Sequence, residues 1–246
     1  MTSEERGALP RYLRRAWGDH PAPGTRGRRA SLSIDEIVTR AVLLADSDGM
    51  AAVSLVKLAA SLEVTPNALY RYLESREELD VLLREHALAE PPTPDPTLPW
   101  QEAVKRWALL LRLRYAAHPW LADLTLSVPI TPHALGWLEA LLIALDSSPI
   151  PRDDVLRTAV LLDGYVREQF LTQRDLSAWS NDDTDPSPDI TGVVSRLLEA
   201  RGLHRVALLF REGSYNEPSD STGDQNFAFG LDRIVLGLEA GASRGR

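Results

Sequence analysis

The chain has no cysteine among its 246 residues, and several other marks of common protein classes are also missing. Without cysteine the fold has no disulfide bond, no thiolate metal ligand and no cysteine nucleophile, which suits a reducing compartment. No apolar run approaches the about 18 residues that a membrane helix needs. The N-terminal "MTSEERGALPRYLRRAWG" lacks the apolar core of a secretory signal. We therefore expect a soluble, cytoplasmic protein with no membrane partner.

Motifs of catalysis and cofactor binding are missing as well. The sequence has no glycine-rich phosphate loop, no nucleophile elbow and no H-E-x-x-H motif. Two acidic pairs, at residues 153–154 and 182–183, fit a helix start and a solvated loop. We predict that the protein is not an enzyme and that it has no catalytic site, no metal site and no cofactor. Its five histidines stand singly, without the i, i+4 spacing of a metal-binding pair: His20, His86, His118, His133 and His204.

Basic residues are outnumbered in the whole chain but concentrated at its N-terminus. The net charge is −8, from 27 Lys and Arg against 35 Asp and Glu, yet residues 1–31 hold seven arginines and three acids. A local basic patch on an acidic body is typical of DNA binding through a small surface. A disordered, solubilising tail accounts for the same cluster, and the sequence leaves both interpretations open. We expect residues 1–30 to form a basic, flexible arm in which Arg28 and Arg29 contact DNA.

The remaining sequence consists of helical segments. Residues 34–45 place apolar side chains at helical spacing, and Ser33 with Glu36 forms a capping box before them. Residues 91–99, "PPTPDPTLP", contain five prolines in nine positions, through which no helix continues. No strand-like alternation of useful length occurs. The helical segments expected after the prolines are residues 100–117, 132–146, 151–176, about 190–201 and 224–240. The predicted fold is all-α, with an N-terminal three-helix domain at residues 31–90, a proline-rich hinge at 91–99, and a larger helical domain at 100–246.

Two short helical segments within the first domain predict a helix-turn-helix motif, and hence a DNA-binding domain. Residues 54–61 and 65–73 are each about two turns long and are joined by the turn 62–64. A helix this short buries little, which fits an element whose outer face enters the major groove. Thr65 and Pro66 supply the N-cap and the first position of the second segment. Leu69 and Leu73, four residues apart, are expected to face inward.

Polar and basic side chains fill the outward positions of this second segment. Arg71 is expected to meet base edges, and Tyr70 and Tyr72 to donate their hydroxyls to phosphates. Ser75 with Glu78 forms a second capping box, which predicts the start of the following helix. Arg76, in the first turn of that helix, adds a phosphate contact near a positive helix end. Packing of the tyrosines, and pairing of Arg71 with the glutamates that follow it, are the alternative. The predicted DNA contacts are Arg28, Arg29, Lys57, Thr65, Asn67, Ala68, Tyr70, Arg71, Tyr72 and Arg76.

Residues 32–83, "LSIDEIVTRAVLLADSDGMAAVSLVKLAASLEVTPNALYRYLESREELDVLL", resemble the N-terminal DNA-binding domain of TetR-family transcriptional regulators. The matching elements are "LAASLEV" as the first helix of the pair, "LYRYL" as the recognition helix and "REELDVLL" after it. The C-terminal "FAFGLDRIVLGLEA" also resembles the last helix of the TetR-type C-terminal domain. By position, the resemblance implies that Tyr70, Tyr72 and Arg76 contact phosphates. It implies that Asn67, Ala68 and Arg71 face bases.

The same resemblance implies a mode of action. The resemblance implies a dimeric repressor that binds double-stranded DNA at a palindromic operator. The repressor leaves the operator when a small, largely apolar effector binds residues 100–246. That larger domain then serves both ligand binding and dimerisation, and the protein associates with the nucleoid through DNA. A helix-turn-helix regulator controlled by a protein partner, or an activator without a small ligand, is the alternative.

Two positions depart from the family pattern. Glu63 occupies a turn position usually held by glycine, and a left-handed backbone there costs about 1 kcal/mol. Val56 stands where relatives often place arginine or another polar base-reading residue. Sequence reading is therefore expected to depend on Lys57, the recognition helix and the N-terminal arm.

Aromatic residues concentrate in the second domain and suggest a ligand site there. Trp107, Trp137 and Tyr165 lie on three predicted helices, each among apolar neighbours. A mostly apolar space with a few polar groups is what a drug-sized ligand requires. Core packing is the alternative for each aromatic taken singly. The predicted ligand contacts are Trp107, Leu111, Arg114, Tyr115, Trp137, Leu141, Tyr165, Gln169 and Phe170.

Residues 151–176 and 224–240 are the predicted dimer helices. Two such helices from each subunit form a four-helix interface. Glycine inside a helix costs about 1 kcal/mol relative to alanine, so Gly164, Gly230 and Gly237 indicate close helix approach. The predicted interface residues are Gly164, Phe227, Leu231, Ile234, Val235 and Leu238.

Overall fold

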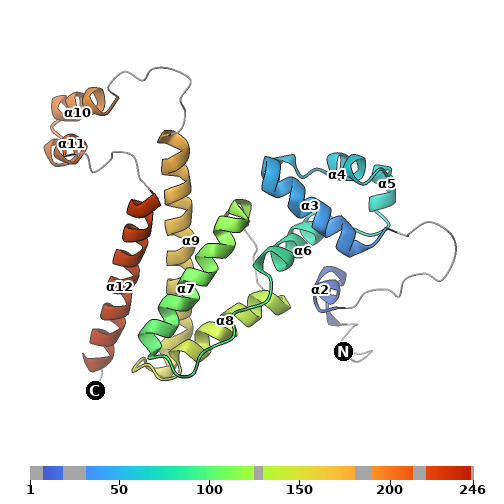
Figure 1. Ribbon diagram of the computed structural model, residues 1–246, viewed down its shortest axis with the longest axis horizontal. Coiled ribbons are helices and arrows are strands. Elements are labelled where there is room, and N and C mark those ends of the chain that lie inside the picture. Colours follow the sequence, from blue (N-terminus) through green and yellow to red (C-terminus); the bar gives the residue numbers. More distant parts are fainter. Residues whose placement is uncertain (1–7, 19–31, 125–129, 181–189, 213–219, 245–246) are drawn as a thin grey trace. The chain divides into compact units, whose positions relative to one another are not determined.

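The computed structural model describes residues 8–18, 32–124, 130–180, 190–212 and 220–244. These residues contain eleven α-helices and no strand, which confirms the all-α prediction (Figure 1). None of the helices in these ranges combines the length and the apolarity required to cross a membrane. The chain divides into two compact units, one running to Asp163 and resuming at Glu239, the other comprising Gly164–Leu238.

The helix-turn-helix region lies in the first unit and matches the predicted segments closely. Its elements are α3 (Ile34–Asp48), a 3-10 turn (Met50–Ala52), α4 (Leu55–Ser61), α5 (Pro66–Leu69) and α6 (Arg76–Leu88). Ser33 accepts from the Glu36 N–H and Glu36 reaches back to the Ser33 N–H, so the predicted capping box forms at the start of α3. Ser54 caps α4 in the same way by accepting from the Lys57 N–H.

The recognition helix is shorter than predicted, since α5 ends at Leu69 and residues 70–72 continue as a turn. Pro66 stands at its first position as expected, but the Thr65 side chain makes no cap hydrogen bond. Leu69 and Leu73 are fully buried and hold the segment on the domain core. The short helix is thus maintained by packing rather than by its own hydrogen bonds.

Two long helices follow in the first unit: α7 (Trp100–Ala117) and α8 (Pro132–Leu145), with a 3-10 turn at Pro119–Asp123. The observed bounds of α7 are those predicted, because Pro99 and Pro119 limit it. A 3-10 turn at Arg152–Asp154 leads into α9 (Val155–Ser180), which crosses into the second unit. The boundary between the two compact units falls at residue 163, within α9, and α6 packs against both α7 and α8.

The N-terminal arm differs from the prediction in residues 8–18. They contain the helix α2 (Arg11–Ala16), which packs on α6. Leu13 is 3% exposed and Arg15 is 5% exposed, so part of the arm belongs to the folded unit. The sequence lacks a capping signal here, since Pro10 precedes the helix without a side-chain cap.

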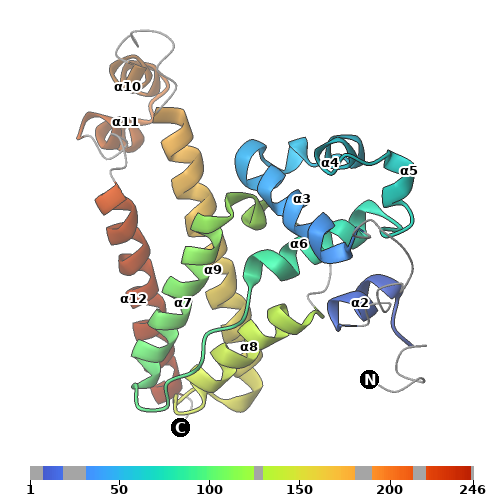
Figure 2. The ribbon, with the colours of Figure 1, turned by 45° about the vertical axis from the view of Figure 1, so that its right-hand side comes forward.

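The second unit contains most of α9, then α10 (Ile190–Ala200), α11 (His204–Arg211) and most of α12 (Asp220–Arg244). Within it α9 and α12 run side by side, and α10 packs on α11 as a hairpin (Figures 1 and 2). The Tyr165 hydroxyl donates to the Phe227 carbonyl at 2.7 Å. A Cβ on Gly230 would lie 2.3 Å from that hydroxyl, so this glycine permits the close approach of α9 and α12 within one subunit.

Candidate nucleic-acid interface and effector site

The turn between α4 and α5 is a Schellman motif with a glutamate in its left-handed position. The Val64 N–H donates to the Ala59 carbonyl at 3.0 Å, and the Glu63 N–H donates to the Ala60 carbonyl at 3.1 Å. Glu63 has φ +56°, the conformation for which glycine is preferred. The turn therefore keeps the backbone that the family pattern assigns to glycine, although the residue has a Cβ.

The predicted DNA-contacting side chains near this turn are mostly at the surface. Ala68 and Tyr72 are partly exposed, whereas Tyr70 has 58% of its surface exposed. Arg71 has no ion-pair partner within the described ranges, and the nearby Glu78 is paired with another arginine. Tyr70 and Arg71 are therefore accessible from solvent. The exposed members of the predicted set are Lys57, Thr65, Asn67, Tyr70, Arg71 and Arg76.

Arg76 is already held by two acceptors of its own domain. Its Nε donates to Asp80 Oδ1 at 2.7 Å, and its Nη1 donates to the Val53 carbonyl. The side chain is still 42% exposed. A phosphate would have to share this guanidinium with Asp80. Arg28 and Arg29, the remaining predicted contacts, lie outside the described residues.

The start of α6 differs in detail from the predicted capping box. Ser75 Oγ accepts from the Glu78 N–H at 3.1 Å, as expected. The Glu78 carboxylate, however, accepts from the Glu74 N–H at 2.6 Å rather than from the Ser75 N–H. It also binds Arg15 at 2.9 Å, and Glu78 is only 1% exposed. A buried carboxylate thus fixes the chain between α5 and α6.

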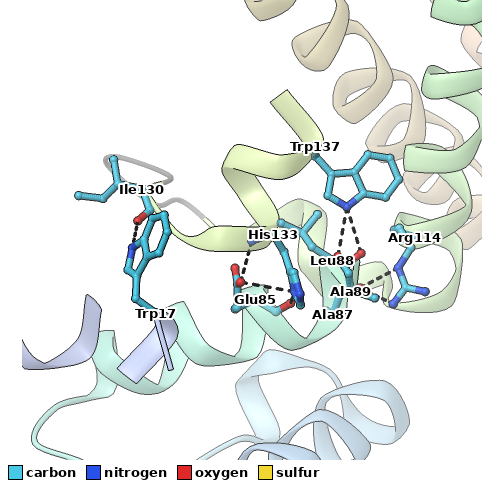
Figure 3. Close-up of polar contacts among 9 residues, drawn as sticks. All are labelled: Trp17, Glu85, Ala87, Leu88, Ala89, Arg114, Ile130, His133 and Trp137. Carbon is cyan, nitrogen blue, oxygen red and sulfur yellow. Dashed lines mark hydrogen bonds and ion pairs between the residues drawn. The ribbon is translucent and has the colours of Figure 1, made fainter. Parts of the chain in front are cut away.

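Side chains of α7 and α8 satisfy the last carbonyls of α6, which have no partner inside the helix (Figure 3). Arg114 donates through Nε to the Ala87 carbonyl at 2.8 Å, and Trp137 donates through Nε1 to the Leu88 carbonyl at 3.2 Å. The His133 N–H donates to Glu85 Oε1 at 2.7 Å. Two predicted ligand residues, Arg114 and Trp137, therefore connect α6 to the larger helices.

A second link joins α3 to the 3-10 turn after α7. Asp46 Oδ1 accepts from Trp120 Nε1 at 2.7 Å and lies 2.8 Å from His118 Nδ1. Burial lowers the pKa of the neighbouring His86, and the charges of His118 and Arg114 lower it further. His86 is therefore biased toward its neutral form. Sequence reasoning gave no signal for this link, since 72 residues separate Asp46 from His118.

The aromatic residues predicted to bind ligand form a packed core in the first unit. The indoles of Trp107 and Trp137 meet edge to face with centroids 6.2 Å apart, and Trp107 Nε1 donates to the Trp137 carbonyl at 2.9 Å. Tyr165, Gln169 and Phe170 belong to the second unit and are partly exposed. The nine predicted residues are thus divided between the two units. Those that are at most 5% exposed are Trp107, Leu111, Tyr115, Trp137 and Leu141.

A cavity of about 220 Å³ does open in the first unit, between the proline-rich segment, α7 and α8. Of the predicted ligand residues it contains Trp107 alone. Next to the cavity, the proline-rich segment packs closely on α8: a Cβ on Gly136 would lie 2.7 Å from Cγ of Pro91. The lining residues are Pro92, Thr93, Pro94, Asp95, Pro96, Leu98, Ala103, Arg106, Trp107, Leu110, Ala140, Ile143, Ala144, Asp146 and Ser147.

The charged groups of this cavity lie among apolar walls. Asp95 accepts from the Thr97 hydroxyl at 2.6 Å and from its N–H at 3.0 Å, which lowers the pKa of Asp95 and keeps it ionised. Arg106 Nη1 lies 3.7 Å from Asp95 Oδ2. Asp146 has no ion-pair partner within the described parts of the chain. An apolar space with a few polar groups is the usual form of a small-molecule site.

The predicted dimer residues divide between buried and open positions. Phe227, Leu231 and Val235 are at most 4% exposed within the subunit, so their side chains have little surface for a second chain. Ile234 and Leu238 are partly exposed. At Gly164 and Gly237 an added Cβ would meet nothing within 4 Å. The open face of α12 instead carries Phe229, 61% exposed, and Leu236, 54% exposed.

Comparison with known proteins shows to which family the chain is similar. Residues 92–242 match the family described as "Tetracyclin repressor-like, C-terminal domain". The chain is 28% identical to the HTH-type transcriptional repressor DrrR1 of Streptomyces coeruleorubidus over 240 residues, covering 95% of this chain and 86% of DrrR1. Apo ActR from Streptomyces coelicolor has a TM-score of 0.70 at 27% identity, covering 89% of this chain and 100% of ActR. A structure of ActR in complex with actinorhodin has a TM-score of 0.66 at 26% identity, with the same coverage.

Proposed function

The chain belongs to the family of tetracycline-repressor-like transcriptional regulators, and we propose that it is a dimeric repressor, released from a palindromic operator by a small, largely apolar effector. It acts in the cytoplasm, at the nucleoid. The observation that carries the proposal is the recognition segment, in which buried Leu69 and Leu73 hold a short helix whose other side chains are exposed. An element of four residues contributes little to a core, which fits a segment whose outer face meets DNA.

Contacts to DNA follow from this arrangement. Arg71, exposed and without an ion-pair partner in the described residues, is available for base edges, which arginine reads by bidentate hydrogen bonds. In this proposal Tyr70 contacts a phosphate and Lys57 takes part in reading the sequence. Val56 is 67% exposed on α4, so an apolar contact with a thymine methyl group is open to it. The relative DrrR1 is itself named a helix-turn-helix repressor, which supports the same assignment.

The effector site is proposed in the cavity beside the proline-rich segment. Residues 92–98 form one wall of this cavity and follow directly on α6, whose first turn adjoins the recognition segment. A molecule that fills the cavity therefore displaces a segment connected to the DNA-binding helices. About 220 Å³ is smaller than the roughly 300–1,000 Å³ of drug-sized sites, so the site admits a small ligand or part of a larger one. The relative ActR has been solved with actinorhodin, which supports a small-molecule effector.

The proposed dimer uses the open faces of α9 and α12. Leu156 and Val160 are 59% and 67% exposed on α9, and Gly164 follows four residues later on the same helical face. On α12 the exposed residues are Phe229 and Leu236. Exposed apolar side chains at helical spacing favour a helix-to-helix interface. Of the predicted residues, Ile234 and Leu238 are partly exposed.

A protein partner in place of a small effector is the second candidate. It is favoured by the hairpin of α10 and α11, where Leu197, Leu203 and Leu208 are 59%, 47% and 51% exposed. Such a surface suits a protein rather than a metabolite. A regulator of this kind needs no ligand in the cavity beside the proline-rich segment.

Selection from a random pool of duplexes tests the DNA-binding part. The full-length protein is expected to enrich a palindrome whose half-sites are about one DNA turn apart, and to bind it as a dimer in sedimentation analysis. Lack of enrichment over an Arg71→Ala control would contradict sequence-specific binding. Enrichment of a single half-site would contradict the dimer.

A thermal-shift screen of the full-length protein tests the effector part, with DNA release as the second readout. Ala103→Phe fills the cavity from α7, whereas Ala116→Phe adds the same ring at an exposed position of the same helix. Compounds that stabilise the native protein and the Ala116→Phe variant, but not the Ala103→Phe variant, bind the proposed site. Stabilisation of both variants alike places the effector elsewhere, and no stabilisation across a broad library favours the protein partner.

A further inference from the structure

The N-terminal helix α2 touches the two parts of the first unit that a regulator has to coordinate. On one side it packs on α6, the helix that follows the recognition segment. On the other side Trp17, directly after α2, reaches the segment that precedes α8 (Figure 3). These contacts come from residues 8–18, none of which is among the individually predicted DNA contacts.

The contact with α6 is a buried ion pair. Arg15 Nη1 donates to Glu78 Oε1 at 2.9 Å, with exposed fractions of 5% and 1%. The other oxygen of the same carboxylate accepts from the Glu74 N–H at 2.6 Å. Glu74 lies in the short stretch that joins α5 to α6, two residues after Tyr72. Arg15 therefore holds the carboxylate that sets where the recognition segment leaves the domain.

The contact with the segment before α8 is a single hydrogen bond. Trp17 Nε1 donates to the Ile130 carbonyl at 3.0 Å. Three residues further on, His133 is bound to Glu85 at the other end of α6. Residues 130–133 are thus tied both to α2 and to the end of α6, as Figure 3 shows.

We propose that α2 is a positioning element for DNA recognition, in which Arg15 orients the exit of the recognition segment and Trp17 ties that orientation to residues 130–133. A displacement at the start of α8 then reaches residues 70–76 through α2 as well as along α6. The inference rests on the proposed DNA binding for its affinity readout, but its structural half can be measured without DNA.

The first experiment tests whether Arg15 orients the recognition segment or only stabilises the fold. Arg15→Met leaves a buried carboxylate unpaired, so both the melting temperature and the DNA affinity are expected to fall. Adding Glu78→Gln removes that charge and keeps an acceptor for the Glu74 N–H, so the melting temperature is expected to return to near its native value. The affinity of the double variant is expected to stay about tenfold below native, because the orienting contact is gone.

Two results would overturn the role of Arg15. Full recovery of affinity in the double variant assigns the pair to stability alone. Arg40→Met is the control, because Arg40 is an exposed arginine of α3 without an ion-pair partner in the described residues. An equal loss of DNA affinity in this variant would show that any lost positive charge weakens binding. In the DNA-free protein, amide exchange at residues 70–76 is expected to be faster in the double variant than in the native chain. Unchanged exchange there contradicts the proposal even if no duplex is ever bound.

The second experiment tests the link through Trp17. In the native chain, binding of the selected duplex is expected to slow amide exchange at residues 66–80 and also at residues 130–137. In Trp17→Phe, which removes the indole N–H and keeps an aromatic ring, only residues 66–80 are expected to respond. Protection at residues 130–137 that persists in Trp17→Phe, or that is missing in the native chain, contradicts the link. Failure to bind any duplex contradicts the proposed function instead.

Discussion

The recognition segment and the aromatic core of α7 and α8 are both marked by large side chains, but they use them in opposite ways. In the recognition segment two leucines are buried, while Tyr70 and Arg71 remain exposed. In the core, Trp107 and Trp137 are at most 5% exposed and both indole N–H groups are bonded within the subunit. The indole N–H groups of the core are thus already engaged within the subunit, although Trp107 also lines the cavity. The two regions thus differ in whether their large side chains are exposed at the surface or packed within the subunit.

The largest expected effect is on the core side of this comparison. Trp107→Ala removes an indole that packs on Trp137 and lines the cavity, and it is expected to lower the free energy of unfolding by about 3–5 kcal/mol. Chemical denaturation measures the loss. Leu109→Ala, at a 49% exposed position of the same helix, is the control and should change stability by less than about 0.5 kcal/mol. Similar losses in the two variants would contradict the assignment of Trp107 to the core.

Arg71→Ala tests the recognition side. Because Arg71 is exposed and has no ion-pair partner in the described residues, its removal is expected to leave the melting temperature unchanged. Affinity for the selected duplex is expected to fall by about 1–3 kcal/mol, with relaxed preference at one base pair. Tyr70→Phe, by contrast, should weaken all duplexes alike, as the loss of a phosphate contact does. Uniform weakening by Arg71→Ala, measured by fluorescence anisotropy, would make it a phosphate contact too.

A smaller effect is expected at two helix ends that share one backbone motif. Helix α10 ends as α4 does, with the Leu203 N–H donating to the Leu198 carbonyl at 2.9 Å and Gly202 at φ +76° in the position that Glu63 occupies after α4. Glu63→Gly is expected to stabilise the protein by about 0.5–1 kcal/mol, and Gly202→Ala to destabilise it by about 1 kcal/mol.

Glu63→Ala is the control for the turn after α4, because it removes the charge of Glu63 and keeps the Cβ. Its free energy of unfolding should match that of the native chain in urea denaturation. A gain in Glu63→Ala as large as in Glu63→Gly would assign the effect to charge rather than to the left-handed backbone.

Local signals predicted most of the helices. Pro99 and Pro119 define α7, and Ser33 with Glu36 defines the start of α3, because proline and capping residues act within one turn. Glu63 was identified as the strained position of the turn for the same reason. The motif Ser75 with Glu78 predicted where α6 starts, although the carboxylate turned out to bind Glu74 and Arg15.

The sequence alone did not predict the contacts between residues far apart in the chain. Arg15 and Glu78 are separated by 63 residues, and nothing in "RYLRRA" shows which arginine is buried. Helix α11 was missed because it is short and follows α10 after a single tight turn. The cavity was missed because its wall is a proline-rich segment, whose path depends on the packing of Pro91 against Gly136.

Gly136 limits how the protein can change during evolution. Even a methyl group at this position displaces Pro91, and with it the segment that joins α6 to α7, although a glycine contributes no side chain to any ligand. In a genetic screen for regulators that still occupy their operator but no longer respond to an inducer, substitutions at residue 136 are therefore expected among the survivors. Such mutants would be assigned to the inducer pocket by phenotype, while the altered residue acts on the neighbouring chain segment.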